Sequence, residues 1–266
     1  MPTTTSGTRE FGGHLTAYDL HTPVGPFPAP FALLIHGFAS HRGTLAGHAA
    51  SLCAAGFVVL NADMSSLFSP TLEAAQLRNV VAAAAHVEWA LSLPAQAGGG
   101  PLADPARVCL CGHSAGGAVA LEACVALRGR GVAVARLCLL DGVPWPRTLG
   151  VARGLLAAGP TPPPRVLSLR AEPGAWNRNA AVVDALRAAR AAAGAGAPLI
   201  TDALLVGSGH GDPINPPQRG LLVRLLGLLG PPRCAQLFAE LLPAFLLARE
   251  GAALAAAGAQ VRVAEI

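Results

Sequence analysis

Residues 108–116 read Val-Cys-Leu-Cys-Gly-His-Ser-Ala-Gly and contain the pattern Gly-x-Ser-x-Gly around Ser114. The first four of these residues are apolar and predict a buried strand, and residues 117–123 predict a helix. A strand, a sharp turn and a helix form the context in which this pattern presents a serine nucleophile. Gly112 and Gly116 leave room for the turn because they have no side chain that would clash. We therefore predict that Ser114 is the nucleophile of an enzyme.

Apolar runs alternate with alanine-rich segments of helical character along most of the chain. Predicted strands cover residues 31–35, 57–61, 108–111, 134–140, 165–170 and 199–206, and predicted helices cover residues 43–55, 76–93, 117–123 and 179–193. This alternation is typical of an α/β fold with a mainly parallel central sheet flanked by helices. The length of 266 residues fits one domain over residues 1–266, with its core at about residues 30–230.

Three segments fall outside this alternation. Residues 94–105 and 141–164 contain several Gly and Pro residues and are predicted to be loops. The second loop follows a strand, where lids often insert, but it is short, which predicts a small cap or none. Residues 231–266 are predicted to form a helical C-terminal extension. Its apolar part, Cys234 to Ala257, is longer than a closing helix requires. It can pack on the domain, form a homodimer contact or touch a lipid surface.

The composition restricts the compartment and the partners that we expect. Hydrophobic residues make up 52% of the chain, but Gly, Pro or Arg interrupts each apolar run before the roughly 20 residues of a membrane span. The formal net charge is +4 with scattered basic residues, so we expect no nucleic-acid partner. The first ten residues lack the apolar segment of a secretory signal. The six cysteines include no Cys-x-x-Cys pair and resemble core residues, which favours the cytoplasm or another reducing intracellular compartment.

A serine hydroxyl needs a general base, and we predict His210 for this role. His210 lies in the sequence Gly209-His210-Gly211-Asp212, after the last predicted strand, and the glycines let the imidazole reach across to the serine. The other histidines fit less well. His36 belongs to a loop after the first predicted strand, and His113 is expected to point elsewhere on the turn.

The base needs a carboxylate partner, and the sequence offers two. Asp141 ends the predicted strand 134–140 and lies 27 residues after Ser114 (141 − 114 = 27). Active sites of open α/β sheets form at the carboxyl ends of the strands, where Asp141 is predicted. Glu172 follows the next predicted strand and stays an alternative acid. Either carboxylate can instead cap a helix or pair with Arg147 or Arg170.

Donors for an oxyanion are predicted in two backbone N–H groups, those of Ala115 and Phe38. Ala115 follows the nucleophile at the start of a helix, and Phe38 follows His36-Gly37 in the loop after the strand 31–35. Phe38, Trp145 and Trp176 are predicted to bind substrate, and they lie with Met64, Leu67 and Phe68 on loops at strand ends. The sequence contains no metal-ligand cluster, phosphate loop or dinucleotide fingerprint, so we expect no metal and no cofactor.

Three motifs occur in the order His36-Gly37-Phe38, then Gly112 to Gly116, then Gly209-His210. In this order and over about residues 30–230, the chain resembles the serine α/β-hydrolase superfamily. The compact layout without a large cap is similar to chlorophyllase, cutinase and polyester-hydrolase-like esterases. Leu140-Asp141-Gly142 resembles the region that carries the catalytic acid in chlorophyllases. Two positions differ: Ala115 stands where chlorophyllases typically have a larger residue, and Gly174 stands where many polyester hydrolases carry their acid.

The resemblance implies a carboxylic ester hydrolase that acts on an apolar, small-molecule ester through an acyl-enzyme. Ser114, His210 and Asp141 would form the catalytic triad. The same residues serve a thioesterase or an acyltransferase, and a hydrolase-like receptor that binds a small ligand with little turnover is a further alternative.

Overall fold

A computed structural model of the chain describes residues 1–65, 72–95, 100–194, 196–198, 200–215 and 228–266. The strands are β1 (Thr3–Phe11), β2 (His14–Thr22), β3 (Ala29–Ile35), β4 (Val58–Ala62), β5 (Ala103–His113), β6 (Val134–Leu140), β7 (Arg165–Arg170), β8 (Ile200–Leu205) and β9 (Val261–Glu265). They form one sheet in the order β1-β2-β4-β3-β5-β6-β7-β8-β9. The six strands from β4 to β8 in this order are parallel, and β1, β2 and β9 pair antiparallel at the two edges.

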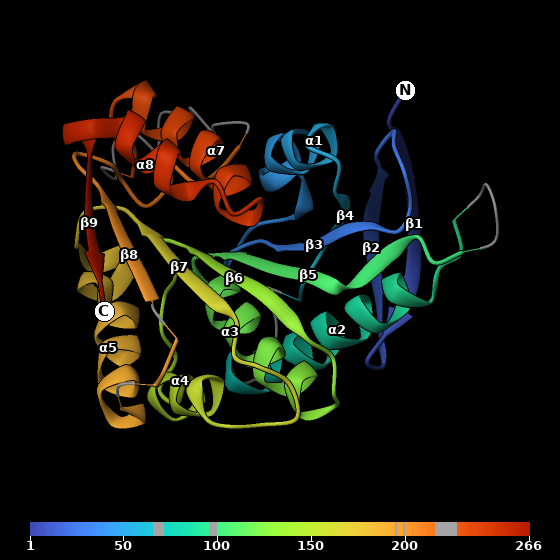
Figure 1. Cartoon of the computed structure of the whole chain (residues 1–266), viewed down its shortest axis with the longest axis horizontal. Helices are drawn as coiled ribbons and strands as arrows, with labels where there is room; N and C mark the ends of the chain where they lie inside the picture. Colours follow the sequence, from blue (N-terminus) through green and yellow to red (C-terminus); the bar gives the residue numbers. More distant parts are fainter. Residues whose placement is uncertain (66–71, 96–99, 195, 199, 216–227) are drawn as a thin grey trace.

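Helices cover both faces of the sheet (Figure 1). The α-helices are α1 (Ala46–Ala54), α2 (Leu72–Ser92), α3 (Ala115–Gly129), α4 (Thr148–Leu156), α5 (Ala181–Ala193), α7 (Pro232–Leu246) and α8 (Glu250–Ala257). Helices α1, α7 and α8 lie on one face, and α2, α3, α4 and α5 lie on the other (Figure 1). The predicted α/β fold with a mainly parallel sheet is confirmed. The described part of the loop after β6 contains only the short helix α4, as expected for a small cap.

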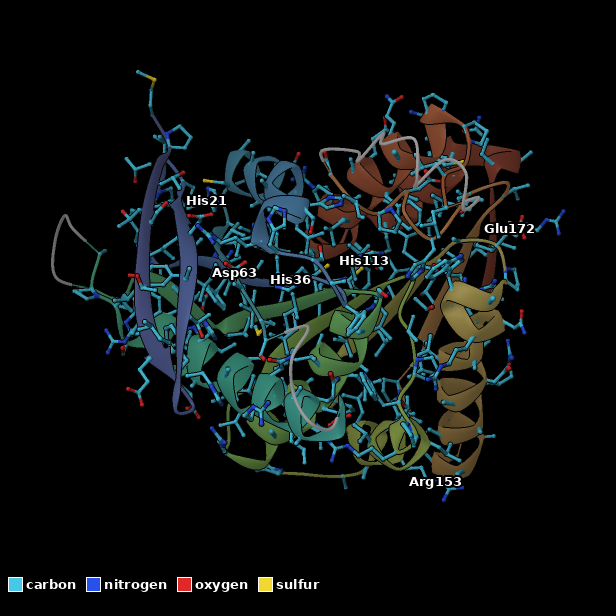
Figure 2. The ribbon with its side chains drawn as sticks, turned by 180° about the vertical axis from the view of Figure 1, so that it is seen from behind. His21, His36, Asp63, His113, Arg153 and Glu172 are labelled. Atoms are coloured by element: carbon cyan, nitrogen blue, oxygen red, sulfur yellow. The ribbon has the colours of Figure 1, made fainter. Side chains whose placement is uncertain are left out.

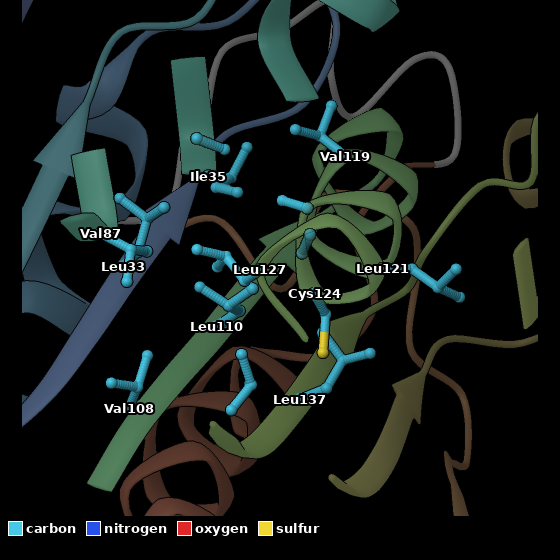
Figure 3. Close-up of a cluster of buried hydrophobic side chains, with 14 of the residues drawn as sticks. Leu33, Ile35, Val87, Val108, Leu110, Val119, Leu121, Cys124, Leu127 and Leu137 are labelled. Atoms are coloured by element: carbon cyan, nitrogen blue, oxygen red, sulfur yellow. The ribbon is translucent and has the colours of Figure 1, made fainter. Parts of the chain in front are cut away.

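The core has one apolar layer on each face of the sheet, because successive strand side chains point to opposite faces. Leu33, Leu110 and Leu137 pack with Leu121 and Leu127 of α3 on one face (Figure 3). On the other face, strand side chains pack with α1 and α7; this layer includes Leu34, Cys111, Leu140, Leu52, Phe238 and Leu242. Because both faces are buried, central strands such as β3 are apolar along their length.

The C-terminal extension differs from its prediction. Residues 231–266 were expected to be helical, but the chain ends in strand β9, which pairs antiparallel with β8. The predicted strand 199–206 is therefore followed by a further strand. Only Val261 of β9 is buried, because β9 forms an edge of the sheet. This edge position removes the strong apolar signal by which a central strand is recognised.

Helix α7 uses its apolar face inside the domain. Its large apolar side chains are all buried, and they are Leu237, Phe238, Leu241, Leu242, Phe245 and Leu246. This accounts for the apolar character of the extension without a second subunit or a lipid. A homodimer or lipid contact through α7 and α8 stays a prediction. Among the described residues, no helix combines the length and the apolar character needed to cross a membrane.

Three further elements, the strands β1 and β2 and the helix α4, are missing from the prediction. Strands β1 and β2 form a hairpin closed by Gly12 and Gly13, both with positive φ. A Gly-Gly pair between two strands is a recognised hairpin signal, so the sequence contained the clue. Helix α4 lies within residues 141–164, which were predicted as a loop; Thr148 to Leu156 is helical because its apolar side chains, including Leu155, pack into the core.

The six cysteines are free and buried, and five of them lie in the two core layers. Cys124 of α3 belongs to the layer of Leu121, whereas Cys53, Cys109, Cys111 and Cys138 belong to the layer of α7. Burial raises the pKa of Cys109 and of Cys124 to about 12.

Candidate active site

Ser114 lies in a strained turn between β5 and α3. Its φ of 55° and ψ of −124° fall in a region that non-glycine residues rarely adopt. The turn is tight because a Cβ at Gly112 would lie 2.1 Å from the Gly116 oxygen, and a Cβ at Gly116 would lie 2.4 Å from the carbonyl oxygen of Ile35. Only glycine fits at these two positions, so the tightness of the turn accounts for both glycines of the Gly-x-Ser-x-Gly pattern.

Hydrogen bonds join Ser114, His210 and Asp141 in series. The Nε2 atom of His210 lies 2.9 Å from the Oγ atom of Ser114, and the Nδ1 atom lies 2.5 Å from Oδ2 of Asp141. The three residues come from the end of β5, the loop after β8 and the end of β6, which meet at one edge of the parallel sheet. A carboxylate on Nδ1 places the proton there and leaves Nε2 free to accept the hydroxyl proton.

Asp141 is 1% exposed and is surrounded by donors. Its Oδ1 atom accepts hydrogen bonds from the backbone N–H of Ala171 and from Nδ2 of Asn177, each at 3.0 Å. With His210 on Oδ2, the buried carboxylate therefore has three partners, as a buried charge requires.

Asn177 is a site residue that the sequence did not reveal. It lies in the 3₁₀ helix η2 (Ala175–Ala180), is 2% exposed and uses both ends of its amide. Its Nδ2 donates to Asp141 and to the carbonyl oxygen of Glu172, and its Oδ1 accepts from Gly174 and Ala180. From the sequence, Asn177 is indistinguishable from an ordinary turn residue, because Asn is common in turns. Its contact with Asp141, which is distant in sequence, therefore leaves no local signal.

The alternative acid Glu172 does not reach His210. Its side chain is exposed and accepts a hydrogen bond from the backbone N–H of Gly207 at 3.1 Å. Figure 2 shows Glu172 at the periphery, whereas His113 beside the serine turn lies near the middle of the molecule. Arg147 and Arg170 were predicted as alternative partners of Asp141 or Glu172. Both bind other carboxylates, because Arg147 pairs with Glu122 and Arg170 pairs with Asp202.

Two buried histidines hold the loop that carries His210. The Nε2 atom of His113 donates to the carbonyl oxygen of His210 at 3.0 Å, and Nε2 of His48 donates to that of Pro213 at 2.7 Å. Burial lowers the pKa of His113 to about 3, with the charge of His210 as a further cause. Burial also lowers the pKa of His48 to about 4. Both rings are therefore neutral at pH 7 and act as fixed donors.

Asp212 closes the same loop on itself. Its Oδ2 atom accepts hydrogen bonds from the backbone N–H groups of Gly209 at 2.8 Å and Gly230 at 2.9 Å. Burial raises the pKa of this carboxyl above its usual range. Asp212 thus shapes the loop and leaves the ring of His210 to Asp141.

The predicted oxyanion donors lie against the serine. A Cβ at Gly37 would lie 2.9 Å from Cβ of Ser114, so the loop after β3 passes in direct contact with the turn. Among the described residues, no protein acceptor takes a hydrogen bond from the N–H of Phe38 or Ala115. Ala115 begins α3, whose first N–H groups have no acceptor within the helix. Both groups are therefore available to a ligand oxygen.

His36 fixes the peptide group between Gly37 and Phe38. Its Nε2 atom accepts a hydrogen bond from the N–H of Met64 at 2.8 Å, so Nδ1 carries the proton and donates to the Gly37 carbonyl oxygen at 2.8 Å. Because the N–H of a trans peptide points away from its carbonyl oxygen, the Phe38 N–H is directed to the opposite side. Burial lowers the pKa of His36, which favours this neutral form.

Ser114, Ala115, His210 and Phe38 line one cleft of about 510 Å³. Its other walls are mainly apolar and include Val143, Pro144, Trp145, Trp176, Ile214 and Leu228. The three side chains predicted to bind substrate, Phe38, Trp145 and Trp176, thus lie in the same cleft. Phe38 is 53% exposed and Trp176 is 52% exposed, so both are open to a ligand.

Met64 lines a small cavity of about 30 Å³ beside His36. This cavity shares lining residues with the cleft, including Phe38, Ala115 and Trp145. Leu67 and Phe68 lie outside the described residues. Within the described part of the chain, no group of three or more His, Cys, Asp or Glu side chains is arranged to hold a metal ion.

Comparisons with known proteins agree with this architecture. The family model "Thioesterase domain" matches residues 99–162, which include β5, the serine turn and Asp141. No curated protein matches the chain in sequence. A candidate dienelactone hydrolase from Klebsiella pneumoniae subsp. pneumoniae MGH 78578 has a similar structure, with a TM-score of 0.63 and 14% sequence identity. The match covers 93% of this chain and 99% of that protein.

Two other structural matches are weaker. Est1E from Butyrivibrio proteoclasticus is 20% identical, with a TM-score of 0.43; the match covers 56% of this chain and 54% of Est1E, about half its length. A dienelactone hydrolase from Anabaena variabilis ATCC 29413 is 17% identical, with a TM-score of 0.46 and coverage of 71% of this chain and 80% of that protein.

The chain is therefore an α/β-hydrolase-fold protein, and its resemblance to this superfamily is confirmed. The family match and the fold together support a hydrolase-type enzyme.

Proposed function

We propose that the protein hydrolyses carboxylic esters through an acyl-enzyme on Ser114. The observation that carries the proposal is the series of hydrogen bonds from Ser114 through His210 to Asp141, at 2.9 Å and 2.5 Å. A nucleophile, a base within reach of it and a carboxylate that orients the base are the parts that acyl transfer requires.

The proposed reaction has two halves. Nε2 of His210 takes the proton of Ser114 as Oγ attacks the ester carbonyl carbon, and the Phe38 and Ala115 N–H groups stabilise the resulting oxyanion. The tetrahedral intermediate collapses, His210 returns the proton to the leaving alcohol, and an acyl-Ser114 ester is left. Water, deprotonated by His210, then attacks this ester. The bond to Oγ breaks, His210 returns the proton to Ser114, and the acid is released. Asp141 stabilises the imidazolium in both halves.

The mainly apolar cleft supports a substrate with an apolar acyl or alcohol part. The proposed chemistry needs neither a metal nor a cofactor, because the attacking and proton-transferring groups all come from the chain.

A thioester is the second candidate substrate. The match of the Thioesterase domain model over residues 99–162, which contain both Ser114 and Asp141, favours it. The residues would act as for an ester. A thiolate leaves more readily than an alkoxide, so a thioester depends less on proton donation by His210.

The experiment compares wild type with Ser114→Ala on p-nitrophenyl esters from acetate to long acyl chains, and on matched S-acyl thiols. We expect turnover in the wild type and its loss in the variant, and the ratio of ester to thioester rates ranks the two candidates. A fluorophosphonate should also label wild type at Ser114 but not Ser114→Ala. Tight binding of esters without labelling or turnover would contradict the proposal and favour the ligand receptor.

A further inference from the structure

Among the described residues, one arginine faces the candidate active site. The described lining of the cleft includes a single Arg or Lys residue, Arg178, and no Asp or Glu. Asp141 does not line the cleft, and its carboxylate is hydrogen-bonded to Nδ1 of His210. The open side of the cleft is therefore a mainly apolar surface with a guanidinium group.

Within the part of the chain that the structure describes, the guanidinium of Arg178 has no hydrogen-bonding partner and is open to a ligand. Several other arginines pair with carboxylates, as Arg147 does with Glu122 and Arg170 with Asp202. Among the described residues, no hydrogen bond or ion pair involves the Arg178 side chain, which is exposed. Residues 66–71 and 216–227 contain no Asp or Glu, and Glu73 at the start of α2 is the acidic residue whose side chain lies outside the described ones.

The backbone holds Arg178 at the cleft in an unfavourable conformation. Arg178, Asn179 and Ala180 have φ values of 51°, 55° and 60°, three successive left-handed residues without a glycine. Such conformations persist where the surroundings enforce them, and they are frequent at ligand sites. Here the preceding residue, Asn177, is bonded to Asp141 on one side and to the Ala180 N–H on the other. The turn that carries Arg178 is thus tied to the carboxylate that holds His210.

We propose that Arg178 determines specificity by binding a negatively charged group on the substrate. The inference rests on the proposed function and names its substrate class, an ester or thioester with an apolar part and an anionic substituent. A guanidinium binds carboxylates and other oxyanions through paired N–H groups. The apolar walls of the cleft, including Trp176 and Pro144, would contact the apolar part of such a substrate.

The test uses two matched substrate pairs, because the charge can lie on either side of the scissile bond. Mono-p-nitrophenyl adipate and p-nitrophenyl hexanoate differ by a carboxylate on the acyl chain. S-butyryl 3-mercaptopropionate and its neutral amide differ by a carboxylate on the leaving group. For each pair, the ratio of kcat/KM on the anionic substrate to kcat/KM on the neutral one is measured, so a folding defect cancels.

In at least one pair, Arg178→Gln should lower this ratio by roughly tenfold or more, the size expected for a lost charged hydrogen bond. Arg178→Lys keeps the charge without the paired donors, so its ratio should lie between those of the wild type and Arg178→Gln. The control is Arg153→Gln, because Arg153 is an exposed arginine on α4, far from His113 (Figure 2), and it should keep the ratio of the wild type.

The outcomes separate the two proposals. Normal turnover with both ratios unchanged in Arg178→Gln would overturn the role of Arg178 alone. A wild type that turns over none of the four substrates, or activity that survives Ser114→Ala, would overturn the proposed function and with it this inference.

Discussion

Strands β6 and β7 are neighbours in the sheet, and an acidic residue follows each of them at the same edge. Asp141 after β6 is buried and has three hydrogen-bonding partners, whereas Glu172 after β7 is exposed and has one backbone partner. The loop after β7 nevertheless contributes to the site, because it brings Asn177 to Asp141. One strand end thus supplies the carboxylate and the next supplies its support. Position at the sheet edge is not sufficient for a role at His210.

The largest expected effect is that of Asp141→Asn. The amide cannot hold the Nδ1 proton of His210 as the carboxylate does, so the wrong tautomer should dominate. We expect kcat on a p-nitrophenyl ester to fall by about 10⁴-fold, as for a comparable triad acid. Circular dichroism should show an unchanged fold. A loss below tenfold would show that Asp141 is not the acid.

The next effect tests the support from β7. Asn177→Ala removes the side-chain donor to Asp141 and the acceptor for Gly174 and Ala180. We expect a loss of roughly 100-fold in kcat, the cost of a misplaced catalytic group, with a smaller change in KM. Asn179→Gly is the control, because it lies in the same turn and glycine tolerates its φ of 55°. Equal kinetics for the two variants would remove the special role of Asn177.

A third prediction concerns pH, because the loop held against Asp141 rests on His113 and His48. Their folded pKa values, about 3 and about 4, lie below the unfolded value of about 6.5, so the unfolded state binds more protons at low pH. The stability that these residues contribute is complete above pH 6.5 and is lost as pH falls towards 4 and 3. Each contributes up to about 1.4 kcal/mol per pH unit to the slope.

Urea unfolding at several pH values between 7 and 4 measures this slope. His48→Gln can keep a donor for the Pro213 carbonyl but does not titrate, so the variant should have a shallower slope than the wild type. Parallel slopes would mean that His48 is protonated in the folded protein, contrary to its burial.

The smallest expected effect belongs to the other carboxylate. Glu172→Gln keeps an oxygen that can accept the Gly207 N–H, and the side chain is exposed. We expect activity within about twofold of wild type and a change in unfolding free energy within about 0.5 kcal/mol. If this variant loses activity as Asp141→Asn is expected to, the contrast between the two strand ends is mistaken.

The sequence predicts those parts of the site that lie within local motifs. Gly112 and Gly116 specify the turn around Ser114, and the glycines beside His210 specify a flexible loop after a strand. Asp141 and Glu172 both follow apolar strands, and only the resemblance of Leu140-Asp141-Gly142 to chlorophyllases favours Asp141. The choice between them depends on burial, and burial depends on how loops from two strands pack together.

The other features that the sequence did not predict also depend on contacts between distant parts of the chain or on a position at the edge of the sheet. Asn177 and the histidine donors act through contacts with residues that are distant in sequence, so no spacing reveals them. Strands β1 and β9 lie at the edges of the sheet, where exposed side chains dilute the apolar pattern that marks the central strands. Strands β6 and β7, buried on both faces, match their predicted limits of 134–140 and 165–170.

The buried cysteines make the stability of each core layer measurable by chemical labelling. A thiol reagent attacks an exposed thiolate, and burial denies both the exposure and, for Cys109 and Cys124, the ionisation. Reaction at neutral pH must therefore wait for an opening of the fold. Cys124 reports on the layer beneath α2 and α3, whereas Cys109 reports on the layer beneath α1 and α7. Mass spectrometry of labelled peptides would then show whether the two layers open together or one before the other.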